Sequence, residues 1–330
     1  MKILVSEFIT GGGLTAEPLP ASLAQEGQMM LEAIVSDLME LNDIDVEVTL
    51  DERCVMKPVP KNITVHIINN NYRESFYQLC QKVDAVLVVA PESDDSLEII
   101  SQLVLAAGKL LSGSSPEVIR LTSSKLATAE YLTEQNIPVI NTRRFDDILF
   151  QQEDLIKNSG WIVKPDQGVG CEQVYFCETE ETIKLAASKC EKAIVQPMIN
   201  GVPASLSMLC HKGHCRVIGY NEQMIERQGN RLQYAGTKVN ALLDHKDQLD
   251  QLAESVSTAL PELRGYVGMD VIISDDKISV VEINPRLTTS YVGLRESIGE
   301  NPAALILKIF MENKLPEIHS SKFKNVLVRV

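Results

Sequence analysis

Three oxygen-bearing side chains near the end of the chain have the types and spacing of a site for a hard cation. Glu282 and Asn284 lie two residues apart in the run "VVEINPR", so on a strand they share one face. Asp270 lies in the preceding apolar run "GMDVII", and a turn at Ser274–Lys277 pairs the two runs, which brings Asp270 close to that face. Mg²⁺ prefers such oxygen ligands and usually leaves positions free for phosphate and water. The sequence therefore predicts a magnesium site on this hairpin.

Cationic side chains suited to phosphate binding accompany the hairpin. Lys164 ends a strand directly before a turn that contains Gly168 and Gly170, in "IVKPDQGVG". Its ammonium can act as a point charge on a phosphate while the N–H groups of the turn cover the phosphates. Arg286 is the last residue of "VVEINPR" and is placed to stabilise a transferring phosphoryl group. Lys125 lies at the start of a helix. Taken singly, most of these charges are better explained as solvated surface residues, so the functional interpretation depends on the ordered set.

In order along the chain, these elements resemble the ATP-grasp superfamily. The similarity runs from about Ser123 to Leu294 and consists of a helix lysine, a strand lysine with a glycine loop, a hinge strand "VQPMI" and an Asp…Glu-x-Asn-Pro-Arg pattern. The resemblance implies an α/β chain of ATP-grasp fold, in which an N-terminal parallel-sheet lobe precedes two α+β lobes that clamp ATP. It places the pre-ATP-grasp domain at residues 1–114, a central lid lobe at 115–198, and a C-terminal lobe with the metal site at 199–330.

The resemblance also implies a role for each of these residues. The expected ATP-binding residues are Lys125, Lys164, Gly168 and Gly170 at the phosphates and Gln196, Pro197, Met198 and Ile199 at the adenine ring. Two Mg²⁺ or Mn²⁺ ions are expected on Asp270, Glu282 and Asn284, and the expected catalytic residues are Arg286, beside an acyl phosphate, and Lys164. Many members have an acidic residue where Gln196 stands and a second near Pro203, so the adenine and ribose contacts depart from the family's pattern.

A glycine-rich run after the first strand raises a separate question. "VSEFITGGGL" places Gly11, Gly12 and Gly13 between that strand and a long amphipathic helix, but without the G-x-G-x-x-G spacing of dinucleotide-binding loops. Ligands of open parallel sheets bind beyond the carboxyl ends of the strands. Glu7 at this loop, or Glu92 after the fourth strand, could therefore pair with a substrate amine, with the glycines allowing close backbone approach. A tight strand-to-helix turn with exposed acids explains the run equally well.

The first third of the sequence alternates strands and helices, which predicts a parallel sheet with helices on both faces. The expected strands are residues 2–6, 45–50, 63–68 and 85–89, and the expected helices are residues 21–41, 72–82 and 97–107. A Ser/Gly/Pro break at Leu111–Pro116 separates this part from a helix at 123–135, for which Ser123 is the expected N-cap. Strand pairs and a helix at 247–260 make up most of the remainder.

The composition limits the classes of function. A chain of 330 residues is long for a single hydrophobic core, so two or three lobes are expected. A net charge of -14 argues against a general nucleic-acid binder, and the first residues do not resemble a signal peptide. No apolar run approaches the roughly 18 residues that span a bilayer, and seven scattered cysteines suggest a reducing compartment. We expect a cytoplasmic protein that binds neither nucleic acid nor membrane, with a homodimer as the candidate assembly.

The cluster "CHKGHC" is the one stretch with the composition of a zinc site. Its flanking runs read as two strands of a hairpin, with Cys210 opposite Cys215 and His211 opposite His214. Neighbouring residues of a strand point to opposite faces, so each face offers two ligands, whereas a structural zinc takes about four. The pattern therefore favours a hairpin tip over a metal site.

The activity implied by the resemblance is carboxylate–amine ligation. ATP phosphorylates a carboxylate to an acyl phosphate, an amine attacks, and phosphate leaves as the amide forms. The whole-chain pattern looks most like the tyramine–glutamate ligase branch, which implies small-molecule carboxylate and amine substrates such as glutamate and tyramine. A ligase of another amino-acid or cofactor pathway fits nearly as well. Two further classes stay open: a non-catalytic ATP-binding module, and a nicotinamide-dependent oxidoreductase that uses the glycines after the first strand.

Overall fold

The alternating pattern of the first third folds into a parallel sheet, as predicted. The computed structural model describes residues 1–56, 63–147, 159–275, 277–318 and 323–330. The sheet has the order β3-β2-β1-β4-β5, and every neighbouring pair is parallel. The bounds of its strands are β1 (Lys2–Glu7), β2 (Asp45–Asp51), β3 (Ile63–Ile68), β4 (Ala85–Val89) and β5 (Leu110–Leu111). The prediction missed β5, because two residues are too few to set up a pattern.

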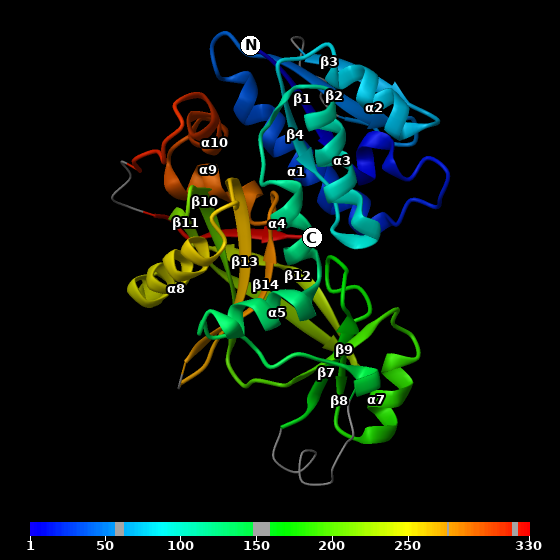
Figure 1. The fold of residues 1–330 in the computed structure, drawn as a ribbon, viewed down its shortest axis with the longest axis vertical. Coiled ribbons are helices and arrows are strands. Elements are labelled where there is room, and N and C mark those ends of the chain that lie inside the picture. Colours follow the sequence, from blue (N-terminus) through cyan, green and yellow to red (C-terminus); the bar gives the residue numbers. More distant parts are fainter. Residues whose placement is uncertain (57–62, 148–158, 276, 319–322) are drawn as a thin grey trace.

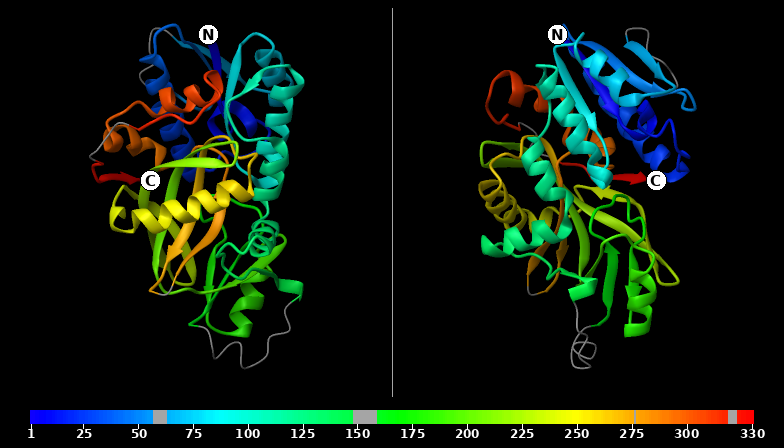
Figure 2. Two further views of the ribbon diagram at one scale, coloured as in Figure 1. Left: turned by 60° about the vertical axis from the view of Figure 1, so that its left-hand side comes forward. Right: turned by 45° about the vertical axis from the view of Figure 1, so that its right-hand side comes forward.

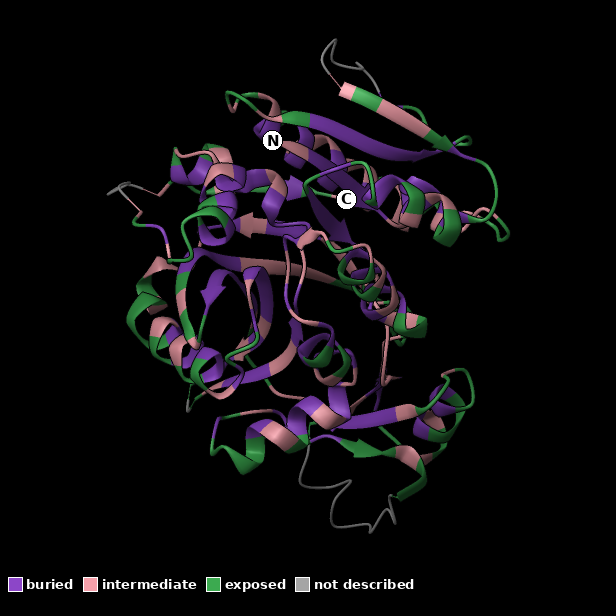
Figure 3. Cartoon of the chain, turned by 45° about the horizontal axis from the view of Figure 1, so that its top comes forward, coloured by how far each residue is buried: buried purple, intermediate pink, exposed green. Residues whose placement is uncertain are grey.

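Burial follows strand position in this sheet. The central strands β1 and β4 are almost entirely buried, whereas β3 forms an edge and alternates between half-buried and exposed residues (Figure 3). Helices cover the sheet, and their bounds are α1 (Ala21–Met39), α2 (Tyr72–Cys80) and α3 (Ser96–Ala106). All three were predicted, and their ends differ from the predicted ones by two residues or fewer.

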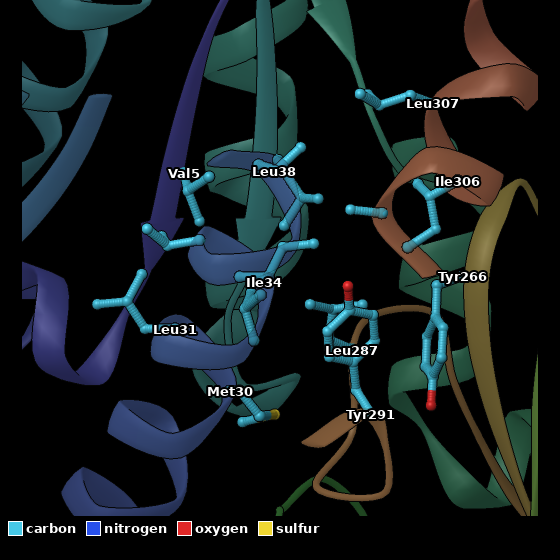
Figure 4. Close-up of a cluster of buried hydrophobic side chains, with 14 of the residues drawn as sticks. Val5, Met30, Leu31, Ile34, Leu38, Tyr266, Leu287, Tyr291, Ile306 and Leu307 are labelled. Carbon is cyan, nitrogen blue, oxygen red and sulfur yellow. The ribbon is translucent and has the colours of Figure 1, made fainter. Parts of the chain in front are cut away.

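Helix α1 links the parallel sheet to the end of the chain. Its apolar stripe, which includes Leu31 and Ile34, faces Val5 of β1 on one side (Figure 4). On the other side it packs against α9 (Tyr291–Ile298) and α10 (Pro302–Met311), with Leu287 and Tyr291 in the same buried cluster. The residues that follow the predicted metal site are therefore fixed against the first helix of the chain (Figures 1 and 4).

The remaining strands form one larger sheet. Its order is β14-β13-β10-β11-β12-β8-β7-β9-β6, and β15 pairs with β12. The bounds of the first five are β10 (Val202–His211), β11 (His214–Gln228), β12 (Arg231–Val239), β13 (Gly265–Ile273) and β14 (Ile278–Asn284). The bounds of the others are β6 (Arg143–Arg144), β7 (Trp161–Pro165), β8 (Tyr175–Cys177), β9 (Ala193–Pro197) and β15 (Val326–Arg329).

This sheet consists of two parts that are joined by a narrow connection between β12 and β8. In the described residues, a single register pair, Arg231 with Tyr175, joins β12 to β8. Strands β7, β8 and β9 and helix α7 (Glu180–Ala187) lie at the end of the molecule opposite the parallel sheet (Figures 1 and 2). The narrow connection supports our proposal that residues 115–198 and 199–330 are separate lobes, beside the first at 1–114.

The helix predicted at 123–135 is α5, which begins two residues later and follows a further helix that was not predicted, and this corrects its N-cap. Helix α4 (Pro116–Ser123) ends where Ser124 takes an extended conformation, and α5 (Lys125–Glu134) begins at the next residue. The side chain of Ser124, not Ser123, accepts the hydrogen bond from the Ala127 N–H at 3.0 Å. Lys125 is thus the first residue of α5, and its position is set by the cap of that helix.

The hairpins near the end of the chain have the predicted registers. Cys210 pairs with Cys215 and His211 with His214, so "CHKGHC" is the tip of the β10–β11 hairpin. Helix α8 (Lys246–Ala259) lies one residue before its predicted bounds. The elements after the parallel sheet that the prediction missed are α4, β6, α7, β12, α9, α10 and β15. No helix in the described parts of the chain is long and apolar enough to cross a membrane.

Candidate active site

The β13–β14 hairpin brings the three predicted metal ligands to one face of the larger sheet. Asp270 is the register partner of Glu282, and Asn284 lies opposite Gly268. All three ligand candidates line a cavity of about 140 Å³, which we call the carboxylate cavity. The turn between the strands closes with a hydrogen bond from the Ser274 N–H to the Lys277 carbonyl at 3.0 Å. Its residue 276 lies outside the described residues. The predicted convergence of these ligands is confirmed.

The two carboxylates of the hairpin are half-buried side by side and have opposite shifts in pKa. Burial, and then the negative charge of Glu282, raises the pKa of Asp270 to about 8. Burial acts in the same direction on Glu282, but the positive charges of Lys125 and Lys164 outweigh it and lower the pKa of Glu282 to about 2. Two carboxylates this close favour a shared proton unless a cation neutralises them.

The donor set of the hairpin fits Mg²⁺ with an incomplete protein shell. It offers two carboxylates and one amide, all oxygen donors of the kind that Mg²⁺ prefers. No group of three or more His, Cys, Asp or Glu side chains in the described residues is arranged to hold a metal. A cation on this hairpin would therefore need further oxygen ligands, such as phosphate or water, which is how Mg²⁺ is usually held beside a nucleotide.

A second cavity, of about 530 Å³, adjoins the first, and we call it the hinge cavity. Its lining contains every residue predicted to bind ATP, namely Lys125, Lys164, Gly168, Gly170, Gln196, Pro197, Met198 and Ile199. The two cavities share six lining residues, namely Val169, Gly170, Cys171, Gln223, Asp270 and Glu282. They consequently meet at the carboxylate pair and beneath the glycine turn.

The two lysines approach this junction from different elements. Lys164, on β7, is only 6% exposed, and burial lowers the pKa of its ammonium while the charge of Glu282 opposes that shift. Lys125 reaches across from α5, with its Nζ 3.3 Å from Oε2 of Glu282 and 3.2 Å from the carbonyl oxygen of Gly168. The junction thus presents two ammonium groups beside two carboxylates, an arrangement suited to a phosphate chain with its metal ion.

The hinge strand β9 supplies apolar surface and backbone groups to the hinge cavity. Gln196 is buried, and its Nε2 donates to Oγ1 of Thr142 at 2.8 Å. The Met198 N–H donates to the carbonyl oxygen of Gly160 at 2.9 Å. This N–H is therefore used by the protein itself, and an adenine ring at this strand would need other backbone groups.

Arg286 lies in the carboxylate cavity and is held by Glu92. One terminal nitrogen of its guanidinium donates to Oε2 of Glu92 at 2.8 Å, and the other donates to the Leu287 carbonyl at 3.1 Å. The side chains of Arg286 and Glu92 are 11% and 5% exposed. Glu92 thus holds the arginine of the predicted site. It lines neither cavity, and a contact with a substrate amine stays a prediction.

Comparison with known families accounts for this arrangement. Residues 122–290 match the ATP-grasp domain family, and residues 44–119 match the pre-ATP-grasp 3 domain. The chain belongs to the ATP-grasp family. The match covers the hairpin with Asp270 and Glu282, the glycine turn and the hinge strand, which are the elements that line the two cavities.

Two curated relatives are similar along most of this ATP-grasp chain. The tyramine–L-glutamate ligase of Methanocaldococcus fervens is 24% identical over 301 residues, which cover 89% of this chain and 89% of the relative. The tyramine–L-glutamate ligase of Methanocaldococcus jannaschii is 25% identical over 297 residues, which cover 89% of this chain and 84% of the relative. The predicted resemblance to this branch is confirmed. The protein is an ATP-grasp ligase that forms carbon–nitrogen bonds.

Solved structures confirm the predicted ATP-grasp fold. A crystal structure of an ATP-grasp superfamily protein from Archaeoglobus fulgidus has a TM-score of 0.73 at 23% identity, and covers 100% of this chain and 92% of that one. The biotin carboxylase domain of Hydrogenobacter thermophilus 2-oxoglutarate carboxylase, solved with MgADP, has a TM-score of 0.71 at 16% identity. That alignment covers 98% of this chain and 72% of the other. The family match implies ATP as the nucleotide of this chain.

The glycine run of this ATP-grasp chain faces the interior of its own lobe. Residues Ile9–Gly13 form a π-helical turn directly after β1. A Cβ added to Gly11 would lie 2.5 Å from Oγ1 of Thr49, and one added to Gly12 would lie 2.6 Å from Cβ of Ile68. Gly12 also has φ of 101°, which favours glycine. None of Gly11, Gly12 and Gly13 lines the two cavities. The close approach of Gly11 and Gly12 is to β2 and β3, that of Gly13 is to Phe8, and a ligand contact of this run stays a prediction.

Glu7 lines the carboxylate cavity but is bound by the same turn. Its carboxylate accepts hydrogen bonds from the Thr10 N–H and the Thr10 hydroxyl, both at 2.7 Å, and from the Ile9 N–H at 3.2 Å. The residue is 2% exposed, and burial raises the pKa of its carboxyl. The visible role of Glu7 is to fix the turn, and a substrate contact stays a prediction.

Sequence reasoning overlooked one acidic residue of the carboxylate cavity. Glu26 lies on α1, three residues after Leu23 and four before Met30, and all three line the cavity. Leu23 and Met30 belong to the apolar stripe of this helix. The available signal was a carboxylate within that stripe, since residues three and four apart share a helix face.

Proposed function

We propose that this ATP-grasp enzyme joins a small-molecule carboxylate to an amine through an acyl phosphate. The observation that carries the proposal is the meeting of the two cavities at Asp270 and Glu282. One cavity has the lysines and glycine turn for a nucleotide, and the other has the arginine and space for a second substrate. A γ-phosphate at the junction would be within reach of a carboxylate held beside Arg286, and this proximity is what transfer requires.

Different residues of the two cavities bind the phosphates, bind the metal ions and stabilise charge in the proposed reaction. Lys125 and Lys164 bind the phosphates. Asp270, Glu282 and Asn284 would hold two Mg²⁺ ions, which when bound would neutralise charge on the transferring phosphoryl group. A substrate carboxylate oxygen attacks the γ-phosphorus, and ADP leaves. Arg286 stabilises the negative charge that develops on the phosphoryl oxygens. The amine nitrogen then attacks the acyl carbon, phosphate leaves, and the nitrogen loses a proton as the amide forms.

We propose that the glycine turn, which contains Gly168 and Gly170, excludes water from the acyl phosphate. It belongs to the central lobe, yet it reaches the first lobe, since Nε2 of Gln167 donates to Oδ1 of Asp95 at 3.2 Å. A Cβ added to Gly170 would lie 3.4 Å from Cδ2 of Leu23 on α1. The turn therefore covers the junction of the cavities, where hydrolysis would compete with the amine.

The two curated ligases supply the candidate substrates, L-glutamate and tyramine. We propose these two compounds as the first pair to test. Other amino acids and amines follow, because only about one residue in four is identical between this chain and the two ligases.

We also propose a cytoplasmic location, which agrees with all seven cysteines being free. A homodimer is our proposal for the assembly, and light scattering on the purified protein measures it.

The decisive experiment mixes the enzyme with Mg·ATP and pairs of amino acids and amines, and follows ADP release together with product mass. The proposal expects sustained ADP release only when both substrates are present, and a product equal in mass to the two substrates less one water. An ATP-binding module without activity would bind an ATP analogue and release no ADP. An oxidoreductase would instead quench or enhance NADH fluorescence and ignore the ATP analogue.

A further inference from the structure

Glu26 is a carboxylate of the carboxylate cavity that neither the metal site nor a protein cation accounts for. It is half-buried, and its Oε2 accepts a hydrogen bond from Oγ1 of Thr289 at 3.0 Å. The described residues place no lysine or arginine in a salt bridge with it. An acidic side chain in a cavity without a cationic partner is costly unless a ligand provides the charge.

The other acids of this cavity are already engaged. Glu7 accepts three hydrogen bonds from its own turn, and Asp270 and Glu282 form the proposed metal pair. Burial raises the pKa of Glu26, while Thr289 and the more distant charge of Arg286 oppose that shift. Glu26 is consequently the acid of this cavity that is placed to receive a positive charge from a substrate.

The surroundings of Glu26 suit the skeleton of a small amine or amino acid. The apolar side chains that line the cavity around it are Ile9, Leu23, Met30, Val89, Ala90 and Pro91. Arg286 lies in the same lining and can receive a carboxylate. The cavity therefore offers one acidic group, one basic group and an apolar wall, which is the complement of an ammonium-bearing carboxylate or amine.

We propose that Glu26 binds the ammonium group of a substrate. The proposal rests on the carboxylate–amine ligase function and deepens it, because it gives one substrate a cationic anchor. Two sources share this chemistry: the α-ammonium of an amino acid that supplies the carboxylate, and the protonated form of the amine, which gives its extra proton to the Glu26 carboxylate before the nitrogen attacks.

The glycine turn connects this anchor to the nucleotide. A Cβ added to Gly170 would lie 3.6 Å from Oε1 of Glu26, so the turn that covers the phosphates also covers the anchor. An ion pair beneath it is shielded from water, and ion pairs strengthen as the surroundings become less polar. Substrate and nucleotide would each favour the closed position of the same turn.

Glu26→Gln tests the proposal, with Glu32→Gln as a matched control on the same helix. Glu32 accepts a hydrogen bond from Gln28 and lines neither cavity. KM is measured for L-glutamate, tyramine and ATP with the full chain, and thermal unfolding verifies that each variant is folded. Loss of a charge-assisted contact of about 1.5–3 kcal/mol corresponds to a rise in KM of about tenfold to a hundredfold.

The expected result in Glu26→Gln is a rise in KM for one ammonium substrate, with the KM for ATP and all values of the control unchanged. A rise for L-glutamate alone places the α-ammonium at Glu26, and a rise for tyramine alone places the attacking amine there. Unchanged KM values for both substrates, or an equal rise for ATP, overturn the proposal.

A binding measurement separates failure of this inference from failure of the ligase function. Calorimetry of L-glutamate and of tyramine is done on the wild type and Glu26→Gln, with Mg²⁺ and an imido analogue of ATP that cannot transfer its γ-phosphate. Weaker binding to the variant supports the anchor even if the wild type forms no amide. Equal binding to both proteins, or no binding of either compound to the wild type, overturns it.

Discussion

Arg286 and Glu92 form a buried ion pair across 194 positions of the chain, with 2.8 Å between the donor nitrogen and Oε2. Glu92 follows β4 of the parallel sheet, whereas Arg286 follows β14 of the larger sheet. The pair thus connects the first lobe to the loop beyond the proposed metal ligands. It also fixes the guanidinium that faces the carboxylate cavity, so a residue of the first lobe controls a proposed catalytic group.

Glu92→Gln is expected to act through Arg286. The variant leaves a buried guanidinium without its anionic partner, and breaking a buried pair from one side costs about 3–5 kcal/mol of stability when no replacement contact forms. The amide of glutamine retains one acceptor, so we expect the smaller loss of about 1–3 kcal/mol by urea unfolding. We also expect kcat to fall while the KM for ATP stays constant. A raised KM for the amine substrate with constant kcat would favour the direct contact suggested by the sequence.

Lys164→Met is expected to weaken ATP binding more than binding of the carboxylate substrate. Lys164 lines the hinge cavity, and its loss removes a charge-assisted contact worth about 1.5–3 kcal/mol. Calorimetry with ATP and with the carboxylate substrate measures both affinities. Lys184→Met is the control, because this lysine of α7 is 62% exposed and pairs with Glu180. An ATP affinity equal to that of the control would remove Lys164 from the phosphate site.

Glu7→Gln is expected to reduce stability more than it changes substrate affinity. The Thr10 N–H, the Thr10 hydroxyl and the Ile9 N–H all donate to Glu7, and an amide NH₂ group in place of one oxygen would oppose a donor. A buried hydrogen-bonding group left without its partner costs about 1–3 kcal/mol. Urea unfolding measures this loss. A higher KM for the amine substrate with unchanged stability would instead show that Glu7 contacts the substrate.

Asp51 and Arg53 give a prediction for stability against pH. Side-chain hydrogen bonds from Arg53 lower the pKa of Asp51 below its ordinary value of 3.8. Arg53 also donates to the carbonyls of Leu14 and Glu17, which follow the run Gly11–Gly13. A carboxyl with a lower pKa in the folded state stabilises the fold above its unfolded pKa and loses that contribution as the pH falls through its folded pKa. The melting temperature of wild type should therefore exceed that of Asp51→Asn at pH 6, with a difference that shrinks below pH 4. A difference independent of pH would contradict the ion pair.

The sequence predicted those parts of the site that follow from strand periodicity. Glu282 and Asn284 share a face because side chains alternate along a strand, and the short hairpin turn brought Asp270 opposite Glu282. The order of motifs likewise placed Lys125 and Lys164 near one another, although they are on different elements. The same reasoning predicted four strands of the parallel sheet, whose apolar runs are bounded by turn residues.

These local patterns did not predict the contacts between lobes. The partner of Arg286 is Glu92, and nothing in the spacing of either residue indicates the other. Gly11 and Gly12 resemble a ligand-binding loop by type, but their neighbours Thr49 and Ile68 come from β2 and β3. Tertiary packing decides whether a glycine admits a ligand or another strand, and a single sequence does not encode that choice locally.

The central claim, that phosphoryl transfer takes place where the two cavities meet, is tested most directly by the turnover of Glu282→Gln. The measurement is Mg·ATP-dependent ADP release with a substrate pair that the wild type ligates, together with thermal unfolding. Glu226→Gln is the control, because Glu226 is an exposed residue of β11 that lines neither cavity. Loss of a metal-binding anion is expected to lower kcat by on the order of 10²–10³ or more, with the fold retained and the control unaffected. Turnover of a folded Glu282→Gln enzyme close to that of the wild type would contradict the account.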